Sequence, residues 1–331
     1  MVAVSVRILR EGDVRAALDM ASCIEAVDRA FAAYSTGRAE LPSVIHLDVP
    51  EAGGQVHVKA GHLHGARYYA VKAASGFYNV DPPAIDGMVV VFDARDGSPA
   101  AFLLDHGYVT DLRTGAAGGV AARHLAPERV ETVAVVGTGL QARYQLDALA
   151  VVRPGFAHVR VWGRNHEHAT HCVDDLLARP GLPEGCHYGV AGSVREAVEG
   201  ADVVITCTAS EEPLVRAEWL QPGAHVTALG SDGAGKQELD VDVLERADVL
   251  VVDSRDQCAQ IGELHHALDA EVVLSPDDVV ELGEICAGLR AGRTDADQLT
   301  VCDLTGVGVQ DVAAANVVME RAAGAGEMLE I

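Results

Sequence analysis

The sequence predicts an α/β protein made of a doubly wound parallel sheet and a discontinuous α+β domain formed by both ends of the chain. Three observations predict this. Strand-like and helical segments alternate after Pro127, the first third carries short strands between turn signals, and the segment 311–327 is again helical and rich in alanine. The expected limits are 1–115 with 311–331 for the discontinuous domain and 116–310 for the parallel sheet.

Composition narrows the classes of protein that fit. The chain has 331 residues, 49% of them hydrophobic, which is enough for two packed domains. It has no apolar stretch of membrane-helix length, and early charges at Arg7, Arg10 and Glu11 leave no room for a signal-peptide core. We therefore expect a cytoplasmic protein without a membrane partner.

Charge and cysteine usage exclude further classes. The formal net charge is -24, which repels nucleic acid and means that any anionic cofactor needs a local group of donors. The seven cysteines are odd in number and form no C-x-x-C pair. Free thiols explain this pattern better than disulfides or a zinc site.

The first third predicts one helix followed by a largely antiparallel sheet. Apolar residues at helical spacing predict a helix over 12–36, ended by Gly37 and Pro42. Turn signals, including Pro82–Pro83, separate strands expected at 44–49, 55–63, 68–75, 87–94 and 100–107. The next segment, 110–125, is expected to be helical. Its small residues favour close packing against either another helix or a cofactor.

The second part begins with an apolar strand, ETVAVV at 131–136, that leads directly into a glycine-rich turn and a helix. The turn reads Gly137-Thr138-Gly139-Leu140-Gln141-Ala142. In such a G-x-G-x-x-A loop the first glycine permits a tight turn, the second lets the backbone approach a pyrophosphate, and the alanine allows close helix packing. The N-terminus of the following helix offers unpaired N–H groups to phosphate oxygens.

Further strands are expected at 158–162, 202–207, 224–229, 248–253 and 300–304, with helices between most of them. This context predicts a Rossmann domain that binds a dinucleotide. A glycine-rich turn without a ligand is the alternative.

The residues after the second strand bear on which dinucleotide binds. An acidic residue there favours NAD, but the sequence has Gly163-Arg164-Asn165. Arg164 can meet a 2′-phosphate, so we expect NAD(P)(H) with a slight preference for NADP(H), and a solvated arginine with NAD bound is the alternative. Small polar residues suit the cofactor edge of the sheet, where plain loops are the alternative; they are Thr206, Thr208 and Thr305.

Five segments carry a family resemblance over nearly the whole chain. YAVKAASGF (69–77), LLDHGYVTDLRTGAAGGVAARHLA (103–126), VVGTGLQA, ALGSDGAGKQEL (228–239) and VCDLTGVGVQD (301–311) resemble, in order, the ornithine cyclodeaminase/mu-crystallin family. They are most similar to its ectoine-utilisation, cyclodeaminase-like subgroup. The resemblance implies a homodimer whose discontinuous domain serves substrate binding and dimerisation. It also implies hydride transfer between a nicotinamide and the α-carbon of a small amino or imino acid.

The resemblance also implies roles for individual residues. Lys72 matches a lysine near the substrate carboxylate or the reacting nitrogen, and Arg113 matches an arginine that binds the carboxylate bidentately. Asp232 matches an acidic residue that positions the amine and handles protons, with an Asx-turn as the alternative. Many members carry an arginine near Pro42 that this chain lacks. His46 or Lys59 are candidates to replace it, and Lys59 faces the same side of its strand as His57.

Several other residues are weaker candidates. Lys236 and Glu238 share a motif with Asp232 but also fit the start of the next helix. Glu263 and His266 are candidates to cap the cofactor pocket, and Asp303 and Gly306 are candidates to contact the nicotinamide amide, as is Thr305. His265 and His266 are adjacent, so on a helix they point about 100° apart, and we expect no metal there.

Three functions remain open from the sequence. The first is an imino-acid (ketimine) reductase or amino-acid dehydrogenase that uses NAD(P)H. The second is an ornithine-type cyclodeaminase, which releases ammonia and recycles its NAD. The third is a cofactor-bound binding protein with little turnover, against which the joint presence of Lys72, Arg113 and Asp232 argues.

Overall fold

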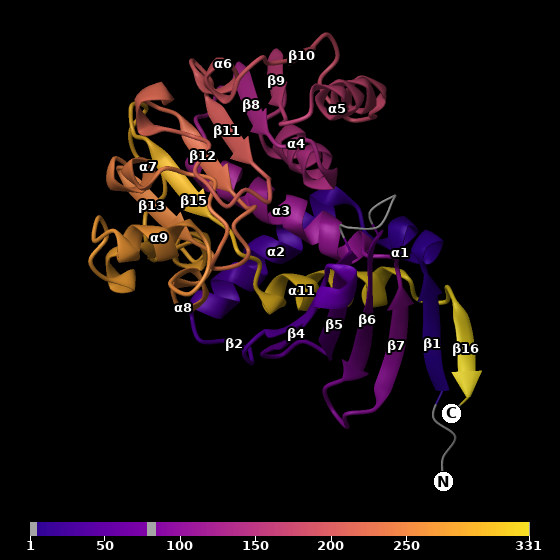
Figure 1. The fold of residues 1–331 in the computed structure, drawn as a ribbon. Helices are drawn as coiled ribbons and strands as arrows, with labels where there is room; N and C mark the ends of the chain where they lie inside the picture. The colour runs from indigo at the N-terminus through magenta and orange to yellow at the C-terminus, as the bar shows by residue number, and fades with distance from the viewer. Residues whose placement is uncertain (1–4, 78–83, 331) are drawn as a thin grey trace. The chain divides into compact units, whose positions relative to one another are not determined.

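The computed structural model describes residues 5–77 and 84–330 (Figure 1). The chain divides into two compact units. The first unit comprises 1–113 with 307–331, and the second unit comprises 114–306. The limits expected from the sequence were 1–115 with 311–331 and 116–310. The turn expected at Pro82–Pro83 falls outside the described residues.

Two helices replace the single helix expected over 12–36. They are α1 (Glu11–Ala17) and α2 (Met20–Ser35). The expectation was wrong at Asp19, whose carboxylate accepts a hydrogen bond from the Ser22 amide at 2.8 Å. An aspartate in this position begins a new helix, because its side chain satisfies one of the N–H groups that a first turn leaves without a partner.

The sheet of the first unit is antiparallel except for one parallel pair, β1 with β7. Its strand order is β16-β1-β7-β6-β5-β4-β2, and β3 pairs with β4. The strands are β1 (Ser5–Arg10), β2 (Ala39–Glu40), β3 (Ile45–Val49), β4 (Gly54–Leu63), β5 (Tyr68–Phe77), β6 (Ala84–Asp93), β7 (Pro99–Leu104) and β16 (Glu327–Glu330). The two strands at one edge, β1 and β16, were not expected from the sequence.

Helix α11 (Gly308–Arg321) crosses this sheet and packs on β4 and β5 (Figure 1). It ends at Arg321, so the expectation of a helix up to residue 327 was wrong over 322–327, which forms a turn and the first residue of β16. Close approach depends on a glycine. A Cβ atom on Gly308 would lie 2.6 Å from the carbonyl oxygen of Ala60, so only glycine lets the first turn of α11 lie directly on β4.

The second unit contains an eight-stranded sheet in which every pair is parallel. Its order is β10-β9-β8-β11-β12-β15-β13-β14. The strands are β8 (Thr132–Val136), β9 (His158–Trp162), β10 (His187–Val190), β11 (Val203–Thr206), β12 (His225–Ala228), β13 (Val249–Val252), β14 (Val280–Glu281) and β15 (Thr300–Asp303). The expected strands are all present, and the edge strands β10 and β14 are additional.

Helices cover both faces of this sheet. They are the second part of α3 (Tyr108–Leu125), α4 (Leu140–Val152), α5 (His166–Ala178), α6 (Val194–Val198), α7 (Val241–Glu245), α8 (Arg255–Cys258), α9 (Glu263–Asp269) and α10 (Leu282–Cys286). On β8, Val133 and Val135 pack in one core with α4 and α5, whereas Ala134 and Val136 pack in the other with α6, α7 and α9. Burial on both faces explains why the strand is apolar throughout, and the doubly wound α/β class is confirmed.

The small residues of α3 pack against another helix. A Cβ atom on Gly118 would overlap the side chain of Gln145 on α4, and Gln145 Nε2 donates to the Thr114 carbonyl at 3.0 Å. Of the two alternatives for this segment, the helix contact is therefore observed. None of the helices in the described ranges has the length and apolar character that crossing a membrane requires.

Candidate functional site

A buried ion cluster lies at the centre of the first unit. Arg113 donates from Nε to Asp311 Oδ1 at 2.9 Å and from Nη1 to Gln310 Oε1 at 2.5 Å. Arg113 is 4% exposed and Asp311 1% exposed, so water screens this pair little. Helix α3 carries the arginine and begins at a turn in which Asp105 Oδ2 accepts from the Val109 amide at 2.7 Å. Helix α11 carries both acceptors in its first turn.

Two lysines join the same cluster from neighbouring strands. Lys72 Nζ lies 3.6 Å from Asp311 Oδ2. Lys59 on β4 stands directly opposite Lys72 on β5 in the antiparallel register, and both side chains are buried. Three basic side chains, Lys59, Lys72 and Arg113, therefore act on the carboxylate of Asp311. Buried basic side chains of this kind are stabilised by anionic partners.

Burial and neighbouring charges set the pKa values of this cluster. Burial lowers the pKa of Lys72 to about 7, and the positive charges of Arg113 and Lys59 act in the same direction while Asp311 opposes them. For Asp311, burial acts to raise the pKa, but the charges of Arg113, Lys72 and Lys59 outweigh it, so the pKa lies below its ordinary value. Lys72 can therefore exchange a proton near neutral pH, and Asp311 is ionised.

Both candidates for the missing arginine share the face that carries Lys72. His46 pairs with His57 across β3 and β4, and His57 lies two residues before Lys59 on the same side of the strand. The rings of His46 and His57 are 4.6 Å apart, and His46 Nε2 lies 3.0 Å from Asp48 Oδ1. Lys59 is the buried one of the two candidates, so it is better placed to act within the cluster.

The glycine-rich loop of the second unit has the conformation that its motif predicts. Gly137 has φ +131°, and a Cβ atom there would lie 2.7 Å from the Cys207 carbonyl oxygen. Gly139 has an ordinary φ of -72°, and nothing lies within 4 Å of the position a Cβ atom would take. Glycine is therefore needed at the first position for the turn. At the second it leaves open space beside the first turn of α4, whose early N–H groups lack helical acceptors.

The end of β9 lies close to this loop. A Cβ atom on Gly163 would overlap the side chain of Thr138, so glycine permits the approach of the two segments. Arg164 is exposed. Asn165 Oδ1 accepts from the amides of Glu167 at 2.8 Å and His168 at 3.3 Å, so this side chain caps α5.

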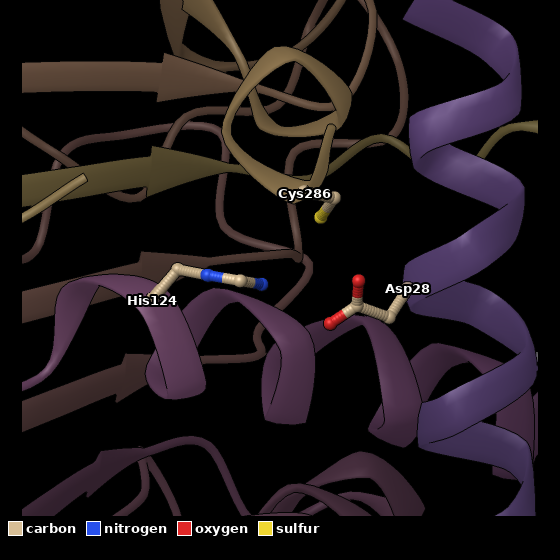
Figure 2. Close-up of side chains that lie close together, drawn as sticks. All are labelled: Asp28, His124 and Cys286. Atoms are coloured by element: carbon tan, nitrogen blue, oxygen red, sulfur yellow. The ribbon is translucent and has the colours of Figure 1, made fainter. Parts of the chain in front are cut away.

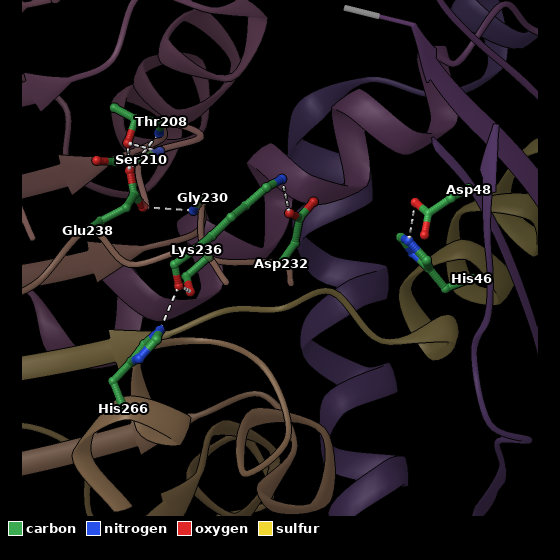
Figure 3. A network of polar contacts seen from close by, with 10 residues as sticks. His46, Asp48, Thr208, Ser210, Gly230, Asp232, Lys236, Glu238 and His266 are labelled. Carbon is green, nitrogen blue, oxygen red and sulfur yellow. Dashed lines mark hydrogen bonds and ion pairs between the residues drawn. The ribbon is translucent and has the colours of Figure 1, made fainter. Parts of the chain in front are cut away.

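A buried carboxylate joins two loops at the carboxyl edge of the sheet. Glu238 is fully buried and accepts from Thr206 Oγ1 at 2.8 Å, Thr208 Oγ1 at 2.7 Å and the Gly230 amide at 2.7 Å (Figure 3). Burial raises the pKa of Glu238, although these donors act to lower it. The two threonine hydroxyls are thus directed at Glu238. Glu238 itself precedes α7 rather than starting a helix.

Further buried carboxylates continue this arrangement. Glu263 accepts from the amides of Glu238 at 2.8 Å and Leu239 at 3.0 Å. Asp303 at the end of β15 accepts from the Leu264 amide at 3.0 Å, and burial raises the pKa of Asp303 to about 8. Thr305 Oγ1 donates to Asp253 Oδ1 at 2.9 Å. All three were candidates for cofactor contact. Thr305 links the ends of the neighbouring strands β15 and β13. Glu263 binds α9 to the segment before α7, and Asp303 binds the end of β15 to α9.

Asp232 lies in the loop after β12 and forms an ion pair with Lys236, whose Nζ is 2.6 Å from Asp232 Oδ1 (Figure 3). The Asp232 side chain is 46% exposed, in contrast to Glu238 in the same motif. His266 Nε2 lies 2.8 Å from the Lys236 carbonyl oxygen, so that ring helps to fix the loop. His265 lies beside Asp269 on α9.

Figure 2 draws a further group of polar side chains. His124, near the end of α3, and Cys286, at the end of α10, offer ligand atoms within 4.8 Å of each other in the second unit. Asp28, also drawn there, lies on α2 of the first unit. A structural zinc site uses more ligands than one histidine and one cysteine, so we propose no metal at this pair.

Sequence reasoning missed Gln310, Asp311 and Arg143. The first two stand in a motif that was noted only as a whole, GVGVQD, yet a buried lysine and arginine require an acidic partner. The available signal was an aspartate in the first turn of a helix. Glycines allow this helix to lie close to the sheet. Arg143 follows the glycine-rich loop at once, and an arginine in the first turn of a helix is unusual because it opposes the helix dipole.

Comparisons with known proteins agree on one family. The family model described as "Ornithine cyclodeaminase/mu-crystallin family" matches residues 5–326. An uncharacterized cyclodeaminase of Sinorhizobium fredii is 40% identical over 96% of each chain. An archaeal alanine dehydrogenase dimer with bound NAD superimposes with a TM-score of 0.88 at 33% identity, covering 98% of this chain and 99% of that one. The Δ1-pyrroline-2-carboxylate reductase of Thermococcus litoralis, in complex with NADH and L-proline, gives 0.90 at 28% identity, covering 97% and 99%.

Proposed function

Because the chain belongs to the ornithine cyclodeaminase/mu-crystallin family, we propose that it is an NAD(P)H-dependent oxidoreductase acting at the Cα–N bond of a small amino or imino acid. Imino-acid (ketimine) reduction is the reaction that we favour. The observation that carries this proposal is the buried cluster of Lys59, Lys72 and Arg113 around the carboxylate of Asp311. These basic side chains suit the carboxylate of a small amino or imino acid.

The glycine-rich loop supports the dinucleotide part of the proposal. Open space beside Gly139 and the unpaired N–H groups of the first turn of α4 fit a pyrophosphate, which needs both close backbone approach and donors. Related enzymes are known with NAD and NADH bound. The exposed Arg164 at the end of β9 supports a slight preference for NADP(H).

When bound, the nicotinamide supplies a hydride to the substrate α-carbon or accepts one from it. Arg113 would hold the substrate carboxylate. Its Nε and Nη1 are fixed by Asp311 and Gln310, and its Nη2 has no acceptor within 5–77 and 84–330. Within the described residues, Gln310 Nε2 is buried without a hydrogen-bond partner. It would supply a further donor to the substrate carboxylate.

Two residues would manage protons at the substrate nitrogen. Lys72, with its pKa near 7, would give a proton to the nitrogen as the imine becomes an amine. Asp232 would position the amine, and its ion pair with Lys236 would hold its carboxylate in place. The cyclodeaminase reaction would use the same groups, and the cyclodeaminase relative at 40% identity is the observation that keeps it as the second candidate.

A paired assay separates the two reactions. We expect oxidation of NADH or NADPH, followed at the absorbance of the reduced nicotinamide, when small oxo acids are supplied with ammonia or an amine. In parallel, ornithine, lysine and 2,4-diaminobutyrate are tested for ammonia release without added reductant. Ammonia release with no net oxidation of the cofactor would instead establish the cyclodeaminase. Turnover in neither assay would contradict the enzyme proposal.

Two substitutions should separate dinucleotide binding from substrate binding. Gly139→Val fills the open space beside the loop, and we expect it to abolish NADH binding measured by fluorescence titration. Arg113→Ala should leave NADH binding near that of the wild type and lower kcat/KM for the imino acid by at least about 100-fold, because a bidentate charged contact is lost.

The matched control for Gly139→Val is Gly163→Val. Here the added side chain meets Thr138, so we expect a lower melting temperature as well as weaker binding. Gly139→Val has no such clash and should melt like the wild type. Unchanged NADH affinity in Gly139→Val would refute the loop assignment, and intact turnover in Arg113→Ala would refute the substrate assignment.

The pH dependence of kcat/KM should report the Lys72 ammonium. We expect kcat/KM for the imino acid to fall as pH rises through about 7, the pKa of Lys72, because the charged form is lost. Asp311→Asn removes the negative charge that raises this pKa, so the falling limb should move to lower pH. Asp93→Asn, which removes a carboxylate paired with Arg95 at the surface, should leave the profile unchanged. A profile that is the same in Asp311→Asn and the wild type would contradict the role of Lys72.

We also propose that the protein is a homodimer, formed through the face of the first-unit sheet opposite Lys72. Side chains alternate along these strands, so Ile45 and Met88 share that face in the observed register. They are 61% and 45% exposed, and Leu47 on the same strand as Ile45 is 56% exposed. An apolar strip of this kind on an open sheet favours burial against a partner, and a related alanine dehydrogenase is a dimer.

Sedimentation equilibrium tests the dimer. We expect a species of twice the chain mass of 34.6 kDa. Leu47→Lys should shift the equilibrium towards the monomer, because burying an unpaired ammonium opposes association. Exposed Leu177 on α5, changed to Lys, is the control and should leave the dimer intact. A wild-type monomer would contradict the proposal.

A further inference from the structure

We propose that Arg143 is a positioning residue for the pyrophosphate of the dinucleotide, acting through the main chain of the glycine-rich loop. The inference rests on the dinucleotide site proposed above and assigns to that site a residue outside its glycine motif. Arg143 lies in the first turn of α4, directly after Ala142. Its side chain turns back towards the N-terminus of the helix, as long helical side chains do.

The contacts of Arg143 tie the loop to a neighbouring helix. Nη1 donates to the Thr138 carbonyl at 2.7 Å and to the Gly139 carbonyl at 2.9 Å. Nε and Nη2 donate to Asp175 Oδ2 on α5 at 3.1 Å and 2.6 Å. The side chain of Arg143 is 12% exposed, whereas that of Asp175 is 62% exposed. Asp175 thus binds Nε and Nη2 of the guanidinium, while Nη1 binds two consecutive main-chain carbonyl groups.

Because a peptide group is planar, the hydrogen bonds to the two carbonyls also orient the N–H groups of the loop. In a trans peptide, the C=O and the N–H of the next residue point in opposite directions. With the carbonyls of Thr138 and Gly139 drawn towards Arg143, the N–H groups of Gly139 and Leu140 face the other way. A pyrophosphate needs donors that are already turned towards it, since ordering them on binding would reduce affinity. Arg143 contributes to this order before the ligand arrives, together with the Ala142 amide, which donates to the Gly139 carbonyl at 3.1 Å.

Electrostatics explain why an arginine is tolerated in this place. A cation in the first turn of a helix is opposed by the positive end of the helix dipole. Asp175 offsets part of this cost, and the ligand proposed for the site is an anion. The whole chain carries a formal charge of -24, so a local cation also reduces the repulsion that a dinucleotide meets on approach.

NADH titration of variants tests the proposal. We expect Arg143→Met to weaken NADH binding about tenfold, the effect of losing hydrogen bonds from a charged group. The kcat at saturating NADH and the KM for the imino acid should stay unchanged, because the substrate contacts belong to other residues. Arg143→Lys should recover part of the affinity, since an ammonium can reach the loop carbonyls but cannot also hold Asp175 as a fork.

Asp175→Ala distinguishes positioning from simple attraction. Positioning predicts that NADH binding weakens, by about two- to threefold, because the guanidinium loses its anchor while keeping its charge. Attraction between Arg143 and the phosphates alone predicts tighter binding, because a competing carboxylate has been removed. The ratio of the Arg143→Met and wild-type dissociation constants should also stay constant from about 0.05 to about 0.5 M salt, whereas attraction alone would be screened.

Arg153 offers a matched control at the other end of α4. It also binds main-chain carbonyls, with Nε donating to Pro127 at 2.9 Å and Nη2 to Arg123 at 2.8 Å. We expect Arg153→Met to lower the melting temperature without changing NADH affinity. Unchanged affinity in Arg143→Met, or an equal loss in Arg153→Met, would overturn the inference. Wild-type protein that fails to bind NADH would instead overturn the proposed function.

Discussion

The carboxylate of Asp311 is the group on which the first unit depends. It meets Arg113 and Lys72, and the sequence separation between Asp311 and Arg113 is 198 residues. Buried cations without a counterion are costly, so the strands and helix that carry them require α11 to lie on the sheet. The same carboxylate lies among the basic side chains of Lys59, Lys72 and Arg113. The residues that stabilise the unit are therefore also the ones that we propose to bind the substrate carboxylate.

The second unit handles charge in the opposite way. Glu238, Glu263, Asp253 and Asp303 are buried at the carboxyl edge of its sheet, and their observed donors are main-chain N–H groups, threonine hydroxyls and a cysteine thiol. Each carboxylate holds a loop at the end of a strand. When the polar groups of a buried network have hydrogen-bond partners, a rearrangement would leave some of them unpaired. Such a network therefore fixes the local geometry. These carboxylates therefore hold in place the edge of the sheet at which Rossmann proteins bind a dinucleotide.

The sequence predicted the second unit better than the first. Its strands are apolar, regularly spaced and separated by helices, so local pattern and tertiary structure agree, and Gly137 forms the tight turn that its motif requires. The first unit depends on long-range pairing. The edge strand β16 and its neighbour β1 have no pattern of their own, and β16 is stabilised by its pairing with β1. Lys72 and Arg113 became candidates through family resemblance. Asp311 and Arg143 were not, because their importance comes from what they touch rather than from a spacing.

The discontinuity of the first unit has a consequence for biosynthesis. The ribosome makes β1 to β7 first, then the whole second unit, and only afterwards α11 and β16. Until then Lys72 and Arg113 lack their counterion, and the apolar side of the sheet that receives α11 has no cover. The second unit is formed by the continuous segment 114–306, so it can complete its fold during translation. During this interval the nascent chain has a folded second unit and an incomplete first unit. Because the sheet of the first unit is uncovered, this is the form of the protein most exposed to chaperones and to aggregation.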